Sequence, residues 1–254
     1  MLRMVDIHSH ILPGLDDGSR DLEESVAMVR MAAAAGTTDI VASPHANQDY
    51  AFDPLVVERK IGELQAALGD TARIHYGCEM HLTPENIESA LRSPGDYSIN
   101  HRGYLLVEFS DFLIPKTTGQ IFARMMQAGM RPIVAHPERN PLMQNRMPML
   151  EAWVEQGVLL QVTAQSLLGR YGKSARAMAH ELMNHGLAHI LASDAHDLQH
   201  RTTAMDEPRR YVEKTFGAES ALRVFEENPG SVLAGVPLVA APRPVPAKKW
   251  FPFW

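Results

Sequence analysis

The sequence predicts a single-domain α/β protein built on a barrel-like parallel sheet. Short apolar runs alternate with longer amphipathic stretches, a pattern typical of parallel strands joined by right-handed helical crossovers. Seven such units favour a barrel over an open sheet. The 254 residues, 45% of them hydrophobic, suffice for one buried core. Two small domains would also fit this length, but no internal linker is seen.

The predicted strands are short, apolar and rich in β-branched residues. They cover residues 4–8, 39–43, 73–78, 104–108, 132–135, 158–162 and 189–192. The helices predicted between and after them cover residues 21–35, 54–68, 84–91, 118–128, 148–156, 175–184 and 202–216. A glycine follows most of these helices, as a left-handed C-terminal cap requires: Gly36, Gly69, Gly129, Gly157, Gly186 and Gly217. One more helix and a turn are predicted over residues 218–235.

The chain ends in a segment of a different kind. We place the folded domain at residues 1–240 and a proline-rich, basic, aromatic tail at residues 241–254. Three interpretations of the tail are open. It could be a disordered extension, or it could pack on its own subunit or on a neighbouring subunit of a homo-oligomer. It could also contact a membrane surface or a partner. Its two lysines, Lys248 and Lys249, would give only weak attraction to a bilayer.

The bulk composition excludes several classes of function. A net charge of −6 provides no overall basic surface of the kind that binds nucleic acid. One cysteine, Cys78, rules out a disulfide framework within the chain and fits a reducing cytoplasm. No apolar run approaches the length of a membrane span, and the first residues lack an apolar signal region. We therefore expect a cytoplasmic protein.

Metal-competent side chains coincide with the predicted strand ends. The carboxyl ends of barrel strands converge on one rim, where active sites are built. Eight side chains fall there: His8, His10, His45, Glu79, Glu108, His136, Asp194 and His196. Asp16 and Asp17 add carboxylates in the first loop, where Gly18 permits a tight turn. The sequence therefore predicts a polar centre at this rim.

Imidazole and carboxylate ligands without thiolate suit manganese, iron or zinc. Nine candidate ligands exceed what one ion needs, so two or three ions sharing a carboxylate are expected. Such a cluster activates water for displacement at phosphorus. A cysteine-dependent phosphatase is excluded, because the arginine required six residues after the nucleophile is replaced by Pro84.

Six motifs occur in an order that resembles a known family. They are DIHSHILPGLDDGSRDLEES, SPHA around His45, Cys78-Glu79-Met80, VEFS at Glu108, AHPERN at His136 and ASDAH at Asp194. Together they resemble the PHP (polymerase and histidinol phosphatase) superfamily, and more closely its CpsB/CapC/YwqE-type tyrosine-phosphatase branch. The resemblance runs to about Gly235.

The resemblance implies a distorted (β/α)7 barrel with a trinuclear, usually manganese-dependent site. Carried over by motif, the first ion would take His8, His10, Glu79 and Asp194. The second would take Glu79, Glu108 and His136, and the third Asp17, His45 and His196. Asp16 stays open as the alternative to Asp17.

Three residues are predicted to be catalytic: Asp194, Arg139 and Arg201. The two arginines are assigned to phosphate binding, because a guanidinium offers two charge-assisted donors in a fork. Tyr50, Tyr104 and Phe112 are candidates to line an aromatic pocket at the rim.

The resemblance implies hydrolysis of phosphotyrosine on a protein, in particular the tail of a bacterial tyrosine kinase controlling capsule or exopolysaccharide synthesis. One alternative is a small-molecule phosphatase of the histidinol-phosphatase kind or another PHP phosphoesterase. An alternative of another class is a metal-binding scaffold without turnover.

Overall fold

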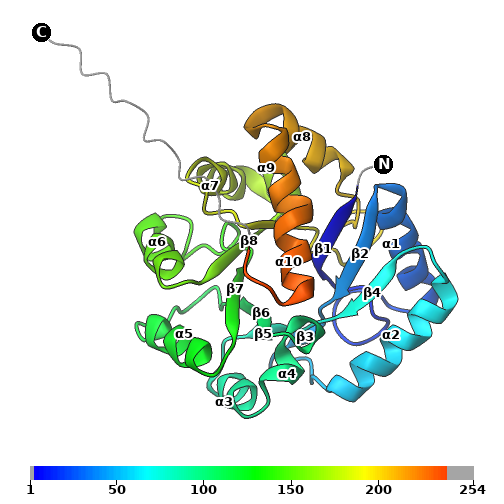
Figure 1. Cartoon of the computed structure of the whole chain (residues 1–254), viewed down its shortest axis with the longest axis horizontal. Coiled ribbons are helices and arrows are strands. Elements are labelled where there is room, and N and C mark those ends of the chain that lie inside the picture. The colour runs from blue at the N-terminus through cyan, green and yellow to red at the C-terminus, as the bar shows by residue number, and fades with distance from the viewer. Residues whose placement is uncertain (1–2, 239–254) are drawn as a thin grey trace, which may run out of the picture.

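Parallel strands form two sheets, with helices packed around them (Figure 1). The computed structural model describes residues 3–238, so the predicted tail of residues 241–254 lies outside them. The three-stranded sheet has the order β1 (Met4–Ser9), β2 (Thr37–Ala42), β4 (Arg73–Tyr76). The six-stranded sheet has the order β3 (His45–Ala46), β5 (Glu79–His81), β6 (Tyr104–Glu108), β7 (Arg131–Ala135), β8 (Leu159–Thr163), β9 (Ile190–Ala192).

The predicted parallel α/β architecture is confirmed. The predicted single seven-stranded sheet is not, because the hydrogen bonds define two separate sheets. The predicted strands 39–43 and 73–78 each break, and the chain then contributes β3 and β5 to the other sheet. Gly77 marks one break, because a Cβ there would lie 2.5 Å from Val41 Cγ1. On the far side, a parallel bridge joins Ser9 to Ala195 and brings β1 next to β9.

The main predicted helices are present, with ends shifted by a few residues. They are α1 (Leu22–Ala34), α2 (Pro54–Leu68), α3 (Pro84–Arg92), α5 (Thr118–Gln127), α6 (Met147–Glu155), α7 (Gly172–Asn184) and α8 (Asp206–Phe216). The side chains of Asp21, Asp53 and Thr83 cap α1, α2 and α3 by accepting backbone N–H groups. All six predicted cap glycines have positive φ, as expected. A short helix, α4 (Pro94–Tyr97), was not predicted.

The C-terminal helical segment closes the amino end of the sheets. It comprises α9 (Ala218–Leu222), a π-helical turn (Arg223–Glu227) and α10 (Asn228–Ala234). Figure 1 shows α10 lying across the strands. Val232 joins an apolar cluster with residues of β1, β2, β6, β7 and β9. Tyr104 and Arg131 donate hydrogen bonds to the carbonyls of Val236 and Gly235. The carboxyl ends of the strands are thus left for the polar centre.

No helix within residues 3–238 combines the length and apolarity needed to cross a bilayer.

A histidine between β8 and β9 is expected to make the fold sensitive to acid. Its Nδ1 accepts the backbone N–H of Leu160 at 3.1 Å, which requires a neutral ring. Burial lowers the pKa of His189 from 6.5 to about 4. The unfolded chain therefore binds more protons between pH 6.5 and about 4, and stability falls as the pH drops through this window, by about 1 to 3 kcal/mol.

Thermal unfolding followed by circular dichroism between pH 4 and 7.5 checks this expectation. His189→Asn keeps an acceptor for the Leu160 N–H and should flatten the pH dependence over this window. His185→Asn, an exposed histidine at the end of α7, is the matched control and should leave the wild-type slope in place. Equal slopes in wild type and His189→Asn would show that His189 does not titrate on unfolding.

Candidate metal centre

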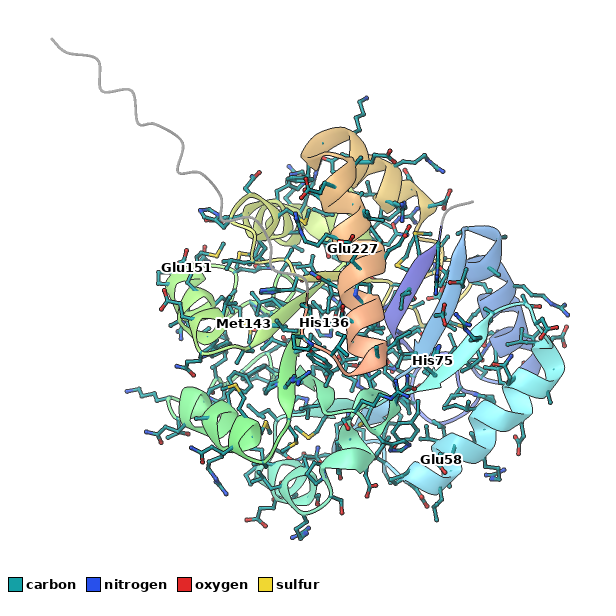
Figure 2. The ribbon with its side chains drawn as sticks, in the orientation of Figure 1. Glu58, His75, His136, Met143, Glu151 and Glu227 are labelled. Atoms are coloured by element: carbon teal, nitrogen blue, oxygen red, sulfur yellow. The ribbon has the colours of Figure 1, made fainter. Side chains whose placement is uncertain are left out.

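The predicted ligands gather at the carboxyl ends of the strands. His8 lies in β1 and His10 just after it, His45 begins β3, and Glu79 begins β5. Glu108 ends β6, His136 follows β7, and Asp194 and His196 follow β9. Figure 2 shows His136 near the middle of the ribbon, whereas Glu58 and Glu151 lie at its edge. All nine predicted ligands fall into overlapping clusters whose ligand atoms lie within 4.8 Å of one another.

A fully buried carboxylate, that of Glu79, lies at the centre of the cluster. Its Oε2 is 3.2 Å from His8 Nε2, 3.2 Å from His10 Nε2 and 3.1 Å from His45 Nδ1. Its Oε1 is 2.9 Å from His136 Nε2. The carboxylate therefore has four imidazole rings around it, the arrangement expected of a bridging ligand.

The spacing of these atoms fits bound cations. Ligand atoms about 2.1 Å from one ion lie roughly 3 to 3.5 Å apart. The Nε2 atoms of His8 and His10 are 3.3 Å apart, a spacing that two ligands of one ion would have. Glu79 Oε2, His45 Nδ1 and His196 Nε2 are buried without a hydrogen-bond partner. A divalent cation would satisfy such orphaned acceptors.

The remaining predicted ligands complete two further groups. Asp194 Oδ1 is 3.5 Å from His8 Nε2, and His8 and Asp194 also cluster with His136. Glu108 Oε1 is 3.9 Å from His136 Nε2, while its Oε2 is 3.6 Å from His45 Nδ1. Glu108 thus lies between His136 and His45. The resemblance assigns Glu108 and His136 to the same ion but His45 to a different one.

The first loop distinguishes its two aspartates. Asp17 Oδ1 is 3.4 Å from both His45 Nε2 and His196 Nε2, so Asp17 belongs to the cluster of candidate ligands. Asp16 instead lies behind His10, whose Nδ1 is 2.7 Å from Asp16 Oδ2. The same oxygen accepts the backbone N–H of His45 at 3.1 Å. These contacts favour Asp17 as the candidate ligand and Asp16 as a residue that orients His10 from behind.

Replacement of these neighbouring aspartates should have different effects on metal binding. Asp16→Asn is expected to weaken metal affinity about 10- to 100-fold, as loss of an orienting partner does, without changing the number of ions at saturation. Asp17→Asn removes a ligand and should lower that number. Metal titration followed by elemental analysis of the two variants checks this. The reverse pattern would make Asp16 the ligand.

Two other orienting residues were missed from the sequence. Gln161 Oε1 is 2.9 Å from His8 Nδ1 at the inner end of β8. His81 Nδ1 is 3.4 Å from Glu108 Oε2, although His81 matches no motif. A glutamine inside the apolar run VLLQV was the available signal for Gln161, because a buried polar side chain needs a partner.

Electrostatics at the centre favour cations. Burial opposes the charged form of His8, but the carboxylates of Glu79 and Asp194 outweigh it and raise the pKa of His8 to about 9. Burial and the neighbouring His10 lower the pKa of His196 to about 4, so this ring is neutral and ready to ligate. The pKa of Glu79 lies well below its usual range, because the surrounding histidines outweigh its burial. The Glu79 carboxylate therefore remains ionised.

Both predicted arginines reach the centre, where they contact Asp194. Arg201 Nη2 is 2.8 Å from each Asp194 oxygen, and Arg139 Nη1 donates to Asp194 Oδ2. The Arg139 guanidinium lies over the Tyr171 ring, 4.5 Å from its centroid. Asp194 and His136 have φ values of 51° and 33°, a left-handed conformation that costs energy in non-glycine residues and is found at functional sites.

The three candidate aromatic residues differ in position. Tyr50 is at the rim, where its ring stacks on His45 with centroids 6.0 Å apart. Phe112 is 93% exposed in the loop after β6. The prediction for Tyr104 was wrong: it begins β6, at the opposite end of the strand from Glu108, and is buried beneath the C-terminal segment. Residues at the two ends of a predicted strand cannot share one rim.

Comparison with known proteins places the chain in a family. The family model "Capsular polysaccharide synthesis, CpsB/CapC" matches residues 4–234. The putative tyrosine-protein phosphatase CapC of Staphylococcus aureus is 37% identical over 204 residues, covering 78% of this chain and 79% of CapC. The tyrosine-protein phosphatase YwqE of Bacillus subtilis is 34% identical over 256 residues, covering 99% of this chain and all of YwqE.

A solved structure supports the same family assignment as the two sequence relatives. It comes from work on YwqE from Bacillus subtilis and CpsB from Streptococcus pneumoniae, described as unique metal-dependent tyrosine phosphatases. The chains superpose with a TM-score of 0.88 at 32% identity, covering 94% of this chain and 98% of that one. The chain belongs to the CpsB/CapC family.

Proposed function

We propose that this protein is a metal-dependent phosphatase that hydrolyses phosphotyrosine on a protein. The observation that carries the proposal is the buried Glu79 carboxylate among four imidazole rings, with two guanidinium groups at the edge of the same cluster. The named activities of the relatives CapC and YwqE supply the substrate class. No nucleic-acid substrate is proposed.

The nine predicted ligands would hold two or three ions, with Glu79 as the bridge. Manganese is our choice, with iron or zinc as alternatives, because the donors are imidazoles and carboxylates. Bound ions would supply a water of lowered pKa and neutralise charge on the phosphoryl oxygens. Asp16, Gln161 and His81 hold the ligand rings and Glu108 in place from behind.

Arg139 and Arg201 are the proposed phosphate-binding residues. Both contact Asp194, and their side chains are only partly buried, 23% and 26% exposed. A phosphoryl group entering beside Asp194 would receive their remaining N–H donors, which match its oxygens in a fork. The arginines then stabilise charge that grows on these oxygens as the ester bond breaks.

Three broader statements complete the proposal. We propose that the substrate is the tyrosine-rich tail of a bacterial kinase in capsule or exopolysaccharide synthesis, in keeping with the family description. We place the reaction in the cytoplasm, in keeping with the free, buried thiol of Cys78. We also read the two sheets as one distorted (β/α)7 barrel of PHP type, in which β2 with β3 and β4 with β5 are interrupted strands.

A substrate panel on a single metal-loaded preparation tests the proposal. We expect hydrolysis of p-nitrophenyl phosphate and of a phosphotyrosyl peptide, and loss of both after chelation. Phosphoseryl peptide and histidinol phosphate should be poor substrates. Preference for histidinol phosphate would make the protein a small-molecule phosphatase, and bound metal without hydrolysis of any phosphoester would make it a scaffold.

A further inference from the structure

A second polar cavity lies at the opposite end of the strands from the metal centre. It has a volume of about 630 Å³ and is lined by the beginnings of β1, β2 and β4, the segment before β6, and α10. Val5 of this cavity and His10 of the metal centre are five residues apart along an extended chain, so roughly 16 Å separates them. The cavity is therefore not a part of the metal centre.

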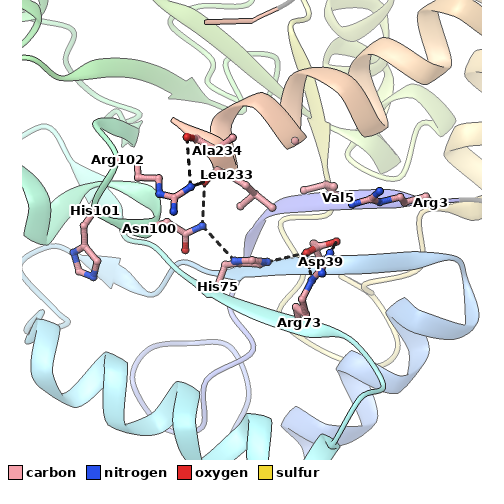
Figure 3. A pocket seen from close by; sticks show the side chains of 11 residues that line it. Arg3, Val5, Asp39, Arg73, His75, Asn100, His101, Arg102, Leu233 and Ala234 are labelled. Atoms are coloured by element: carbon pink, nitrogen blue, oxygen red, sulfur yellow. Dashed lines mark hydrogen bonds and ion pairs between the residues drawn. The ribbon is translucent and has the colours of Figure 1, made fainter. Parts of the chain in front are cut away.

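The floor of this cavity is a chain of hydrogen bonds (Figure 3). His75 Nε2 lies 2.9 Å from Asp39 Oδ1, and Asn100 Nδ2 donates to His75 Nδ1 at 3.2 Å. Asn100 Nδ2 also donates to the carbonyl of Leu233 in α10 at 3.3 Å. Because Asn100 donates to Nδ1, Nε2 is the ring nitrogen that donates to Asp39. The floor is thus fixed by side chains from three parts of the fold.

The one carboxylate of the cavity has no acceptor capacity left for a ligand. Asp39 Oδ1 accepts from Arg73 Nε at 2.7 Å and from His75. Asp39 Oδ2 accepts from Arg73 Nη2 at 2.9 Å and from Thr38 Oγ1 at 2.7 Å. A carboxylate has about four acceptor sites, and all are filled. Asp39 is also 4% exposed, so it presents little negative charge to the cavity.

The cavity has, in contrast, more hydrogen-bond donors than its own acceptors can use. Arg73 uses two of its five N–H groups on Asp39 and is 66% exposed. Arg102 forms only long bonds, 3.3 and 3.4 Å, to the carbonyls of Leu233 and Ala234. Arg3 is exposed and has no ion-pair or hydrogen-bond partner among residues 3–238. Three arginines therefore line a cavity that has one carboxylate, itself fully satisfied, in a chain whose net charge is −6.

The backbone at the cavity is strained as well. Asn100 and His101 have φ values of 50° and 59°, and neither is glycine. Two consecutive residues in the left-handed region persist only where the surroundings hold them there, which is common at ligand sites. The hydrogen bonds of Asn100 to His75 and Leu233 provide that hold.

We propose that this cavity binds a small phosphorylated molecule, with Arg3, Arg73 and Arg102 as donors to its phosphate oxygens. Guanidinium groups match phosphate in fork geometry. The volume is that of a small-ligand site. Figure 3 shows Arg102 near the Asn100 end of the hydrogen-bonded floor, and Arg73 and Arg3 toward its Asp39 end, so the ligand would lie across that floor.

Calorimetric titration with inorganic phosphate tests this assignment. Because phosphate is also the product of the proposed reaction, the titration uses metal-loaded protein that carries His136→Ala and Arg139→Ala, which together impair the metal centre and its proposed phosphate binding. We expect this protein to bind phosphate, and the added pair Arg3→Ala and Arg102→Ala to weaken binding at least ten-fold. Arg210→Ala, an exposed arginine on α8, is the matched control and should not change binding. Equal binding with and without the arginine pair would overturn the assignment.

Soaking crystals of the unmodified metal-loaded protein in tungstate gives a second test that does not depend on a variant. Tungstate is an electron-dense mimic of phosphate, and we expect its density within hydrogen-bond distance of Arg73 and Arg102. Density at the metal centre alone, or an ion held only by lattice neighbours, would overturn the assignment.

Discussion

Replacing Glu79 by glutamine is expected to lower kcat for a phosphotyrosyl peptide by on the order of 10³ or more, with loss of at least one bound ion per chain. Glutamine keeps the shape of the side chain but removes its charge. Four imidazole rings contact the Glu79 carboxylate, so they lose the anion that bridges them. Elemental analysis and steady-state kinetics on one preparation measure both effects.

Glu138→Gln is the matched control for this experiment. Glu138 is equally buried and lies two residues from His136, but its Oε1 accepts from the Thr163 N–H at 3.0 Å and the Ser166 hydroxyl at 2.7 Å. Burial raises the pKa of Glu138, so its neutralisation costs less. We expect full metal content in this variant. Retention of metal and activity by Glu79→Gln would show that Glu79 is not the bridge.

Replacing Arg139 by alanine is expected to lower kcat/KM about 10²- to 10³-fold with metal content unchanged. The reason is loss of charge stabilisation on the phosphoryl oxygens, because Arg139 is proposed to bind phosphate rather than metal. Arg139→Lys should recover only part of the activity, since an ammonium group cannot reproduce the fork. Kinetics with p-nitrophenyl phosphate, which lacks a polypeptide, separate phosphate binding from recognition of the protein substrate.

Arg209→Ala is the control for the arginine series. Arg209 is a buried arginine paired with Glu226 at 2.7 Å, away from the cluster, so its loss tests general destabilisation. If Arg139→Ala lost metal in proportion to activity, Arg139 would act by holding Asp194 in place and not by binding phosphate.

The clustering of the candidate ligands could be predicted from the sequence because one topological rule governs it. Parallel strands align their carboxyl ends, so residues that follow successive strands converge, whatever their distance along the chain. His8, Glu79, His136 and Asp194 were placed together on that basis, and the structure brings them into contact. Strand periodicity and cap glycines likewise located most elements to within a few residues.

Other features depend on contacts that the sequence does not record. The break after β4 lies where Gly77 approaches Val41, a long-range steric relation. Gln161 orients His8 from a strand 153 residues away. Tyr104 was misplaced because hydropathy marks a strand without showing which of its ends faces the site. The contacts of Arg139 and Arg201 with Asp194 likewise require the folded chain.

Anomalous diffraction from crystals of the manganese-loaded protein, recorded at the manganese edge, tests the central claim most directly. The account predicts at least two peaks at the carboxyl ends of the strands, each within coordination distance of a Glu79 oxygen or of a neighbouring ligand. A single peak remote from Glu79, or none in a preparation that hydrolyses phosphotyrosyl peptide, would contradict it.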